Sequence, residues 1–89
     1  MTKKIAVLVR DRQEEALRMA VGLILENDEV NIFVMDGKLE DSESLTLTLE
    51  TLKELNVKIY SNNPQNSFEQ MSTENIARVL VNYDSVIPY

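Results

Sequence analysis

The feature that most constrains the fold is a pair of short, continuous apolar runs. Ile5–Val9 and Val30–Met35 both contain β-branched residues, and each is closed by charged or turn-forming residues. Strands covered on both faces of a parallel sheet have this continuous apolar character, whereas half-exposed strands alternate between apolar and polar residues. The two runs therefore predict interior strands of a parallel sheet.

Shorter strand segments and helical stretches alternate with these runs. The stretch 45–55 has leucines on one helical face, but its first part also alternates with period two; the helix is favoured because the spacing continues into residues of high helix propensity. The additional strands are Val57–Tyr60 and Ser85–Ile87, and the helices run roughly from Arg12 to Glu26, over 45–55, and from Ser72 to about Tyr83.

This alternation predicts the fold class. Apolar strands separated by amphipathic helices form a parallel sheet with helices on both faces, because crossover connections are right-handed. We expect a small α/β, flavodoxin-like three-layer sandwich of about four parallel strands. Residues 1–89 are expected to form a single domain of this kind.

Capping signals mark the ends of two predicted helices. Asp11 precedes the first helix, and Glu14 occupies the reciprocal capping-box position. Ser72 precedes the last helix, with Met71 and Ile76 at the positions of a hydrophobic staple. We expect Asp11, Glu14 and Ser72 to accept hydrogen bonds from the free N–H groups at the starts of these helices.

The first helix is unusually apolar. Its apolar residues cover roughly 240° of the helical wheel, whereas a surface helix needs a stripe of about 100°. One flank should therefore pack on the sheet and the other on a second apolar surface. We expect that surface to belong to another copy of the chain in a homo-oligomer; the alternative is that helices two and three, or the C-terminal segment, cover it within one chain.

Composition excludes several kinds of chemistry. The 89 residues carry a net charge of −6 and include no Cys, His or Trp. Thiol chemistry, imidazole catalysis and zinc sites of Cys and His are therefore absent. The acidic balance argues against nucleic acid as a partner. The run Ile5–Val9 is too short for a signal peptide or membrane span, so we expect a cytoplasmic protein that does not bind membranes, with no cofactor and no metal.

Open α/β sheets bind ligands beyond the carboxyl ends of their strands. Polar residues follow each of the first three predicted strands, and a binding site there would take a small polar or anionic ligand. No residue of this set is expected to be catalytic. The candidate binding residues are Arg10, Arg12, Asp36, Gly37, Ser61, Asn62 and Asn63.

Each candidate also has a purely structural interpretation. Arg10 and Arg12 can be solvated surface charges. Asp36-Gly37 can form a turn in which Gly adopts positive φ, and the G-x-G-x-x-G that accompanies a ribose-binding acid is absent. The segment 61–64 has strong turn chemistry and can be a simple loop. The sequence leaves these alternatives open.

Four segments together resemble the DsrE/DsrF-like sulfur-relay family. The resemblance lies in the pattern of apolar segments and covers most of the chain. It implies a flavodoxin-like fold and assembly into trimers, hexamers or hetero-oligomers, including a partner subunit of the same family. The segments are Lys3–Asp11, Ala16–Leu23, Asp28–Gly37 and Leu52–Tyr60.

The chain departs from this family at its reactive position. Active members carry a persulfide on a Cys just after the third strand, and that position falls at Asn62, beside Ser61. An amide is not a nucleophile, and a lone hydroxyl lacks an activating base. The resemblance therefore implies a non-catalytic protein that acts through oligomerisation, partner docking or ligand binding. The alternative is an accessory subunit of a sulfur-transfer complex whose reactive Cys comes from a partner chain.

Overall fold

The computed structural model of the chain describes residues 3–26, 29–35, 37, 39, 42–66 and 68–88. No helix in these ranges is both long enough and apolar enough to cross a membrane. In chain order, the elements are β1 (Lys4–Val9), α1 (Gln13–Leu25), β2 (Glu29–Val34), α2 (Glu43–Glu54), β3 (Lys58–Ser61), β4 (Glu69–Gln70), α3 (Thr73–Leu80) and β5 (Ser85–Pro88).

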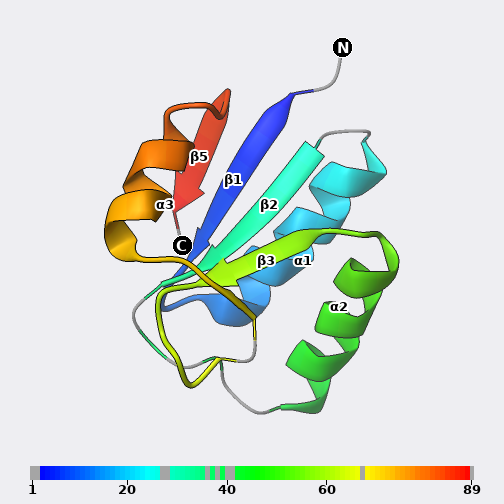
Figure 1. Cartoon of the computed structure of the whole chain (residues 1–89). Helices are drawn as coiled ribbons and strands as arrows, with labels where there is room; N and C mark the ends of the chain where they lie inside the picture. Colours follow the sequence, from blue (N-terminus) through cyan, green and yellow to red (C-terminus); the bar gives the residue numbers. More distant parts are fainter. Residues whose placement is uncertain are drawn as a thin grey trace.

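The strands of the described residues form one five-stranded sheet in the order β4-β3-β2-β1-β5, and all neighbouring pairs are parallel (Figure 1). The predicted α/β fold with a parallel sheet is confirmed, and β1 and β2 are interior strands. The sheet has one strand more than the approximate prediction. The additional strand, β4, consists of Glu69 and Gln70, which are exposed and give no apolar signal.

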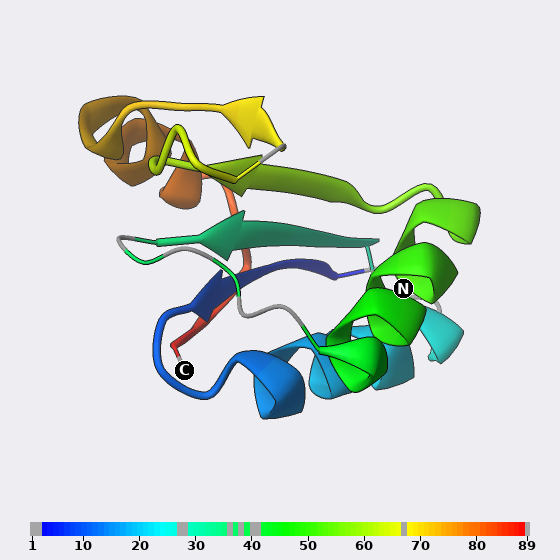
Figure 2. The same ribbon diagram turned by 90° about the horizontal axis from the view of Figure 1, so that it is seen from below.

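The helices lie on both faces of this sheet. From β1 to β2 to β3 the chain advances in one direction, and β5 then joins the opposite side of β1. Right-handed crossovers consequently place α1 and α2 on one face and α3 on the other, as Figure 2 shows. The predicted three-layer, flavodoxin-like sandwich is thereby confirmed.

The face under α1 and α2 holds the larger part of the core. Alternate residues of β1 and β2 point to this face, where Leu17 of α1 and Leu45 and Leu52 of α2 cover them. These strands are apolar on their other face as well, which explains their continuous runs. The buried strand residues on this side are Ile5, Val7, Val9, Val30, Ile32, Val34 and Ile59.

The face under α3 is less completely covered. Ala6, Phe33 and Met35 are buried there together with Ile76 of α3. However, α3 has only eight residues, whereas α1 and α2 have 13 and 12. Beyond the reach of α3, polar and aromatic side chains of β2 and β3 remain half-buried or exposed on this face.

Helix capping differs from the prediction at α1. The N-cap is Arg12 rather than Asp11, and no side chain caps the helix. Glu14 makes no capping box; its carboxylate instead accepts hydrogen bonds from Arg18, at 2.7 Å, and from the hydroxyl of Ser44. Glu14 therefore links α1 to the first turn of α2 instead of capping its own helix.

The predicted cap of α3 is confirmed. Ser72 accepts a hydrogen bond from the backbone N–H of Asn75 at 3.2 Å. Met71 and Ile76 both belong to the apolar cluster on the α3 face. Ser42 caps α2 in the same way, through the N–H of Leu45 at 3.2 Å. These caps fix where both helices begin.

The wide apolar arc of α1 is covered largely within one chain. Met19, Val21, Leu23 and Ile24 are partly buried against the main core, and α2 packs alongside α1. Leu25, near the end of the helix, remains 72% exposed. The arc alone therefore does not require a second copy of the chain, and the homo-oligomer stays a prediction.

Candidate functional site

The fold brings the loops that follow β1, β2 and β3 to one edge of the sheet (Figure 1). Arg10 and Arg12 follow β1, Gly37 follows β2, and the segment 61–63 begins at the end of β3. Asp36 lies outside the described residues. We call this edge, with residues 10–12, 37 and 61–66, the carboxyl edge.

The β1 loop at this edge is mainly acidic. Arg12 lines a pocket of about 310 Å³ together with Asp11, Glu14 and Glu15. The Arg12 guanidinium lies 3.8 Å from the Glu15 carboxylate, and both side chains are exposed. One guanidinium among three carboxylates is an unfavourable environment for an anion. Arg10 is exposed at the end of β1.

Buried and partly buried hydrogen bonds tie the other two loops together. The amide of Asn66 donates to Ser61 Oγ at 2.9 Å and to the Gly37 carbonyl at 3.2 Å, and its oxygen accepts from Leu39 N–H at 2.9 Å. Ser61 is fully buried, and its hydroxyl also accepts from Asn63 N–H at 3.1 Å. Ser61 is therefore held inside the loop, without access to solvent.

Gly37 differs from the expected turn. Its φ is not positive, although the sequence suggested a turn that uses this freedom of Gly. Its N–H donates to the Met35 carbonyl at 2.7 Å, and its carbonyl accepts from Asn66. Backbone hydrogen bonding, rather than a left-handed conformation, fixes this residue.

The two asparagines of the loop have structural partners. Asn62 Nδ2 donates to Thr73 Oγ1 at 3.0 Å, which ties the loop to the start of α3. Asn63 Oδ1 accepts from Gln65 N–H at 2.9 Å, as in an Asx turn. The polar groups of this loop thus bond to one another. Asn66 is not among the residues predicted from the sequence, because its role depends on contacts with Gly37 and Leu39, far away in the chain.

A second location has a different character. A pocket of about 420 Å³ opens on the α3 face, near the amino ends of β1, β2 and β3. Its volume is within the range typical of small-molecule sites. We call it the α3-face pocket. Its lining includes Lys4, Glu29, Asn31, Phe33, Val57, Lys58, Tyr60, Met71, Val79, Asn82 and Tyr83.

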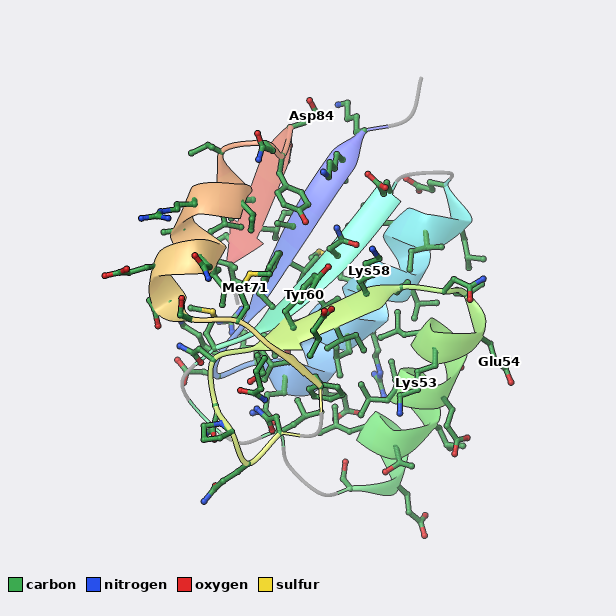
Figure 3. The ribbon with its side chains drawn as sticks, in the orientation of Figure 1. Lys53, Glu54, Lys58, Tyr60, Met71 and Asp84 are labelled. Atoms are coloured by element: carbon green, nitrogen blue, oxygen red, sulfur yellow. The ribbon has the colours of Figure 1, made fainter. Side chains whose placement is uncertain are left out.

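Strand register places the polar side chains of the pocket side by side. Asn31 of β2 is the cross-strand partner of Lys58, and Phe33 is the partner of Tyr60. Figure 3 shows Lys58, Tyr60 and Met71 on the side of the sheet that carries α3. Alternation along the strands explains this arrangement, because residues two apart point to the same face.

Tyr83 closes the pocket from the loop after α3. Its hydroxyl accepts a hydrogen bond from Asn31 Nδ2 at 2.6 Å. The Lys4 ammonium lies 4.9 Å from the centroid of the Tyr83 ring, a cation–π distance. Asp84 holds Lys4 in place, because its carboxylate accepts from Lys4 N–H at 2.7 Å and its own N–H donates to the Lys4 carbonyl at 2.8 Å.

Aromatic rings line the centre of the pocket. Phe33 is stacked on Tyr60 with centroids 5.2 Å apart, and its ring meets Tyr83 edge to face at 5.9 Å. Burial raises the pKa of Tyr60 above its usual value, and the charge of Glu69 and the neighbouring Tyr83 add to the increase. The Tyr60 phenol is consequently neutral at physiological pH.

The described lining of the pocket holds two cationic side chains and one acidic side chain. Among the described residues, neither Lys4 nor Lys58 forms an ion pair with a carboxylate. Glu29, the cross-strand partner of Lys4, is the acidic side chain in the described lining, and the charge of Glu69 acts on Tyr60. The chain as a whole has a net charge of −6, so the lining of this pocket is less acidic than the chain on average.

The polar groups that line the pocket are ammonium, amide and phenol groups. The sequence has no Cys or His, and the described residues contain no group of three potential metal ligands close together. The sequence did contain a signal for the pocket: Asn31 interrupts an otherwise apolar run, and Lys58 and Tyr60 alternate with Val57 and Ile59. No family model, no curated protein and no solved structure matches the chain.

Proposed function

We propose that the chain is a non-catalytic binding domain that holds a small polar or anionic ligand in the α3-face pocket. One observation carries this proposal: Lys4 and Lys58, without carboxylate partners among the described residues, flank the Asn31 amide beside aromatic rings. Ammonium groups, an amide and a phenol together offer several hydrogen-bond donors to an anion.

The surroundings of the pocket strengthen this electrostatic argument. An acidic chain repels anions at long range, so a site for one needs local positive charge. The α3-face pocket has two lysines and one acid, whereas the pocket around Arg12 has one arginine and three acids. We therefore place the ligand on the α3 face rather than at the carboxyl edge suggested by the sequence.

The resemblance to DsrE/DsrF-like proteins is part of this proposal. At the position of the reactive Cys, Asn62 donates to Thr73 and serves to hold the loop. This supports a member of that group without sulfur-transfer activity. An accessory subunit that uses a partner's Cys stays the alternative, and a Cys-bearing DsrE-like chain that co-purifies with the protein would favour it.

We also propose a cytoplasmic homo-oligomer, on the basis of the resemblance. Leu47 and Val81 are exposed apolar side chains that an interface would bury, with exposures of 64% and 81%. Sedimentation equilibrium at micromolar concentration tests the oligomer. A mass that stays at 10.2 kDa would contradict it.

The binding function is tested by a heteronuclear NMR titration of the full chain with acetate, sulfate and 2-naphthoate. Each is compared with sodium chloride at equal ionic strength. We expect at least one of these anions to shift the backbone amides of Asn31, Lys58 and Tyr83. The proposal is wrong if none does, or if the saturable shifts lie at Arg10, Asn62 and Asn63 instead.

A further inference from the structure

We infer that the ligand of the α3-face pocket is a planar aromatic anion: a flat ring system that carries a carboxylate or a similar acidic group. This inference rests on the proposed function and defines its ligand class. It follows from the division of the pocket into an apolar aromatic part and a polar, positively charged part.

The apolar part is formed by flat and polarizable side chains. Tyr60 and Phe33 are stacked, with ring planes 20° apart, and Met71 from the segment before α3 also lines the pocket. Aromatic side chains favour other rings by stacked or edge-to-face contacts, and thioethers favour aromatic partners. Tyr60 is half-buried, so part of its ring remains available to a ligand.

The polar part lies next to these rings on the same face of the sheet. Lys58 stands two residues before Tyr60 on β3, and Asn31 stands two residues before Phe33 on β2. A step of two residues along a strand is about 6.6 Å, which a fused two-ring system can span when its acidic substituent contacts the Lys58 ammonium. A ring over Tyr60 would thus place its acidic group near Lys58.

Tyr83 can add a directional contact to that acidic group. Its hydroxyl oxygen accepts from Asn31, and no described residue accepts the hydrogen of this hydroxyl. The hydroxyl can therefore donate to a ligand while Asn31 fixes its position. A phenol that accepts one hydrogen bond and donates another to an anion is a strong, oriented donor.

Other ligand classes fit less well. A cationic ring would meet Lys4 and Lys58, and Lys4 already occupies a position over Tyr83. A saturated, puckered anion could reach the lysines but would make poorer contact with the ring of Tyr60. A small inorganic anion would leave the aromatic surface uncovered. The planar aromatic anion is the class that uses both parts of the pocket.

The test compares three probes with the same carbon skeleton by NMR titration of the full chain. 2-Naphthoate is flat and anionic, decahydro-2-naphthoate is puckered and anionic, and 2-naphthalenemethanol is flat and neutral. We expect 2-naphthoate to bind up to about fivefold more tightly than either, since one stacking contact or one exposed ion pair contributes up to about 1 kcal/mol. Shifts should appear at Asn31, Lys58, Tyr60 and Tyr83.

The outcomes separate this inference from the proposed function. If the puckered anion binds the same amides as tightly as 2-naphthoate, the inference about planarity is wrong while the binding function stands. If the neutral compound binds as tightly, the inference about charge is wrong. If no probe moves these amides, the inference fails here, and acetate and sulfate decide the binding function.

Variants of Tyr60 provide a second measurement. Tyr60→Phe keeps the ring and should retain the preference for the flat anion. Tyr60→Leu removes the ring and should reduce that preference to less than about twofold. If Tyr60→Leu proves unfolded by its NMR spectrum, Tyr60→Met, which keeps a long apolar side chain without a ring, replaces it. A folded ringless variant with an unchanged preference would overturn the inference.

Discussion

The carboxyl edge and the α3-face pocket are both rich in polar side chains, but they use them in opposite ways. At the carboxyl edge, Asn66 bonds to Ser61, Gly37 and Leu39, so the loops satisfy one another. In the α3-face pocket, Lys4 and Lys58 have no carboxylate partner among the described residues, and Asn31 orients the Tyr83 hydroxyl.

This difference shows why residue type alone is a weak guide to a binding site. Asn and Ser close to the ends of strands are consistent with a ligand site, but they are equally consistent with loop structure. What distinguishes the two regions is whether the hydrogen-bonding groups are satisfied within the chain. We expect substitutions at the carboxyl edge to affect stability and substitutions of charge in the pocket to affect binding.

The largest expected effect is that of Phe33→Ala. Phe33 is fully buried and packs against both Tyr60 and Tyr83, so the variant leaves a cavity and loses two ring contacts. The free energy of unfolding should fall by about 3–5 kcal/mol, measured by urea denaturation. Phe68→Ala, at a half-buried ring, is the matched control and should lower the free energy of unfolding by less. An equal decrease of the unfolding free energy in the two variants would show that the pocket is not built on a packed aromatic core.

Asn66→Ala should have the next largest effect. We expect it to lower the free energy of unfolding and to leave ligand binding unchanged. The variant leaves the buried hydroxyl of Ser61 and partly buried backbone groups of Leu39 and Gly37 without their partner. Unpaired buried groups of this kind cost about 1–3 kcal/mol. Gln65→Ala, at an exposed position in the same loop, should change the unfolding free energy little. Weaker binding of 2-naphthoate by a folded Asn66→Ala variant would contradict the separation of the two regions.

Lys58→Gln should affect binding with little change in stability. Lys58 is exposed, so its loss removes positive charge without disturbing the core. The dissociation constant of 2-naphthoate should rise up to about fivefold, as expected for an exposed ion pair. Lys53→Gln removes an exposed lysine of α2 and Arg12→Gln removes a charge at the carboxyl edge; both should leave binding unchanged. Calorimetry or NMR titration measures all three variants.

The smallest effect concerns the titration of Tyr60. Its folded-state pKa is raised, chiefly by burial, so the neutral phenol is favoured in the folded chain. The resulting stabilisation is complete below the unfolded pKa of about 10 and is lost as the pH rises through the higher folded value. Absorbance at alkaline pH should show one tyrosine that ionises late, and Tyr60→Phe should remove that step. A late step that persists in Tyr60→Phe would contradict this assignment.

The layered fold was predictable because its signals are local. The continuous apolar runs of β1 and β2 reflect burial on both faces, and Ser72 marks the start of α3 by a contact with Asn75, three residues away. The cap of α1 was not predicted correctly, since Glu14 bonds to Ser44 on another helix. The strand β4 escaped prediction because two exposed polar residues carry no pattern.

The site was less predictable because its contacts join residues that lie far apart in the sequence. The α3-face pocket depends on strand register and on a hydrogen bond between Asn31 and Tyr83, which lie 52 residues apart. The carboxyl-edge residues do gather at one edge, as topology requires. Their hydrogen bonding within the chain, however, follows from long-range contacts such as that of Asn66 with Gly37. Spacing in the sequence contains neither piece of information.

The most direct test of the account is a map of backbone amide shifts during titration of the full chain with 2-naphthoate. The account predicts saturable shifts at Asn31, Lys58, Tyr60 and Tyr83, while Arg10, Asn62 and Asn63 stay unchanged. Asn31 and Lys58 lie in the first halves of their strands, whereas Arg10, Asn62 and Asn63 follow the carboxyl ends, so the map distinguishes these positions. Tyr60 lies between them, near the end of β3. Saturable shifts confined to the carboxyl edge would contradict the central claim that the α3-face pocket is the binding site.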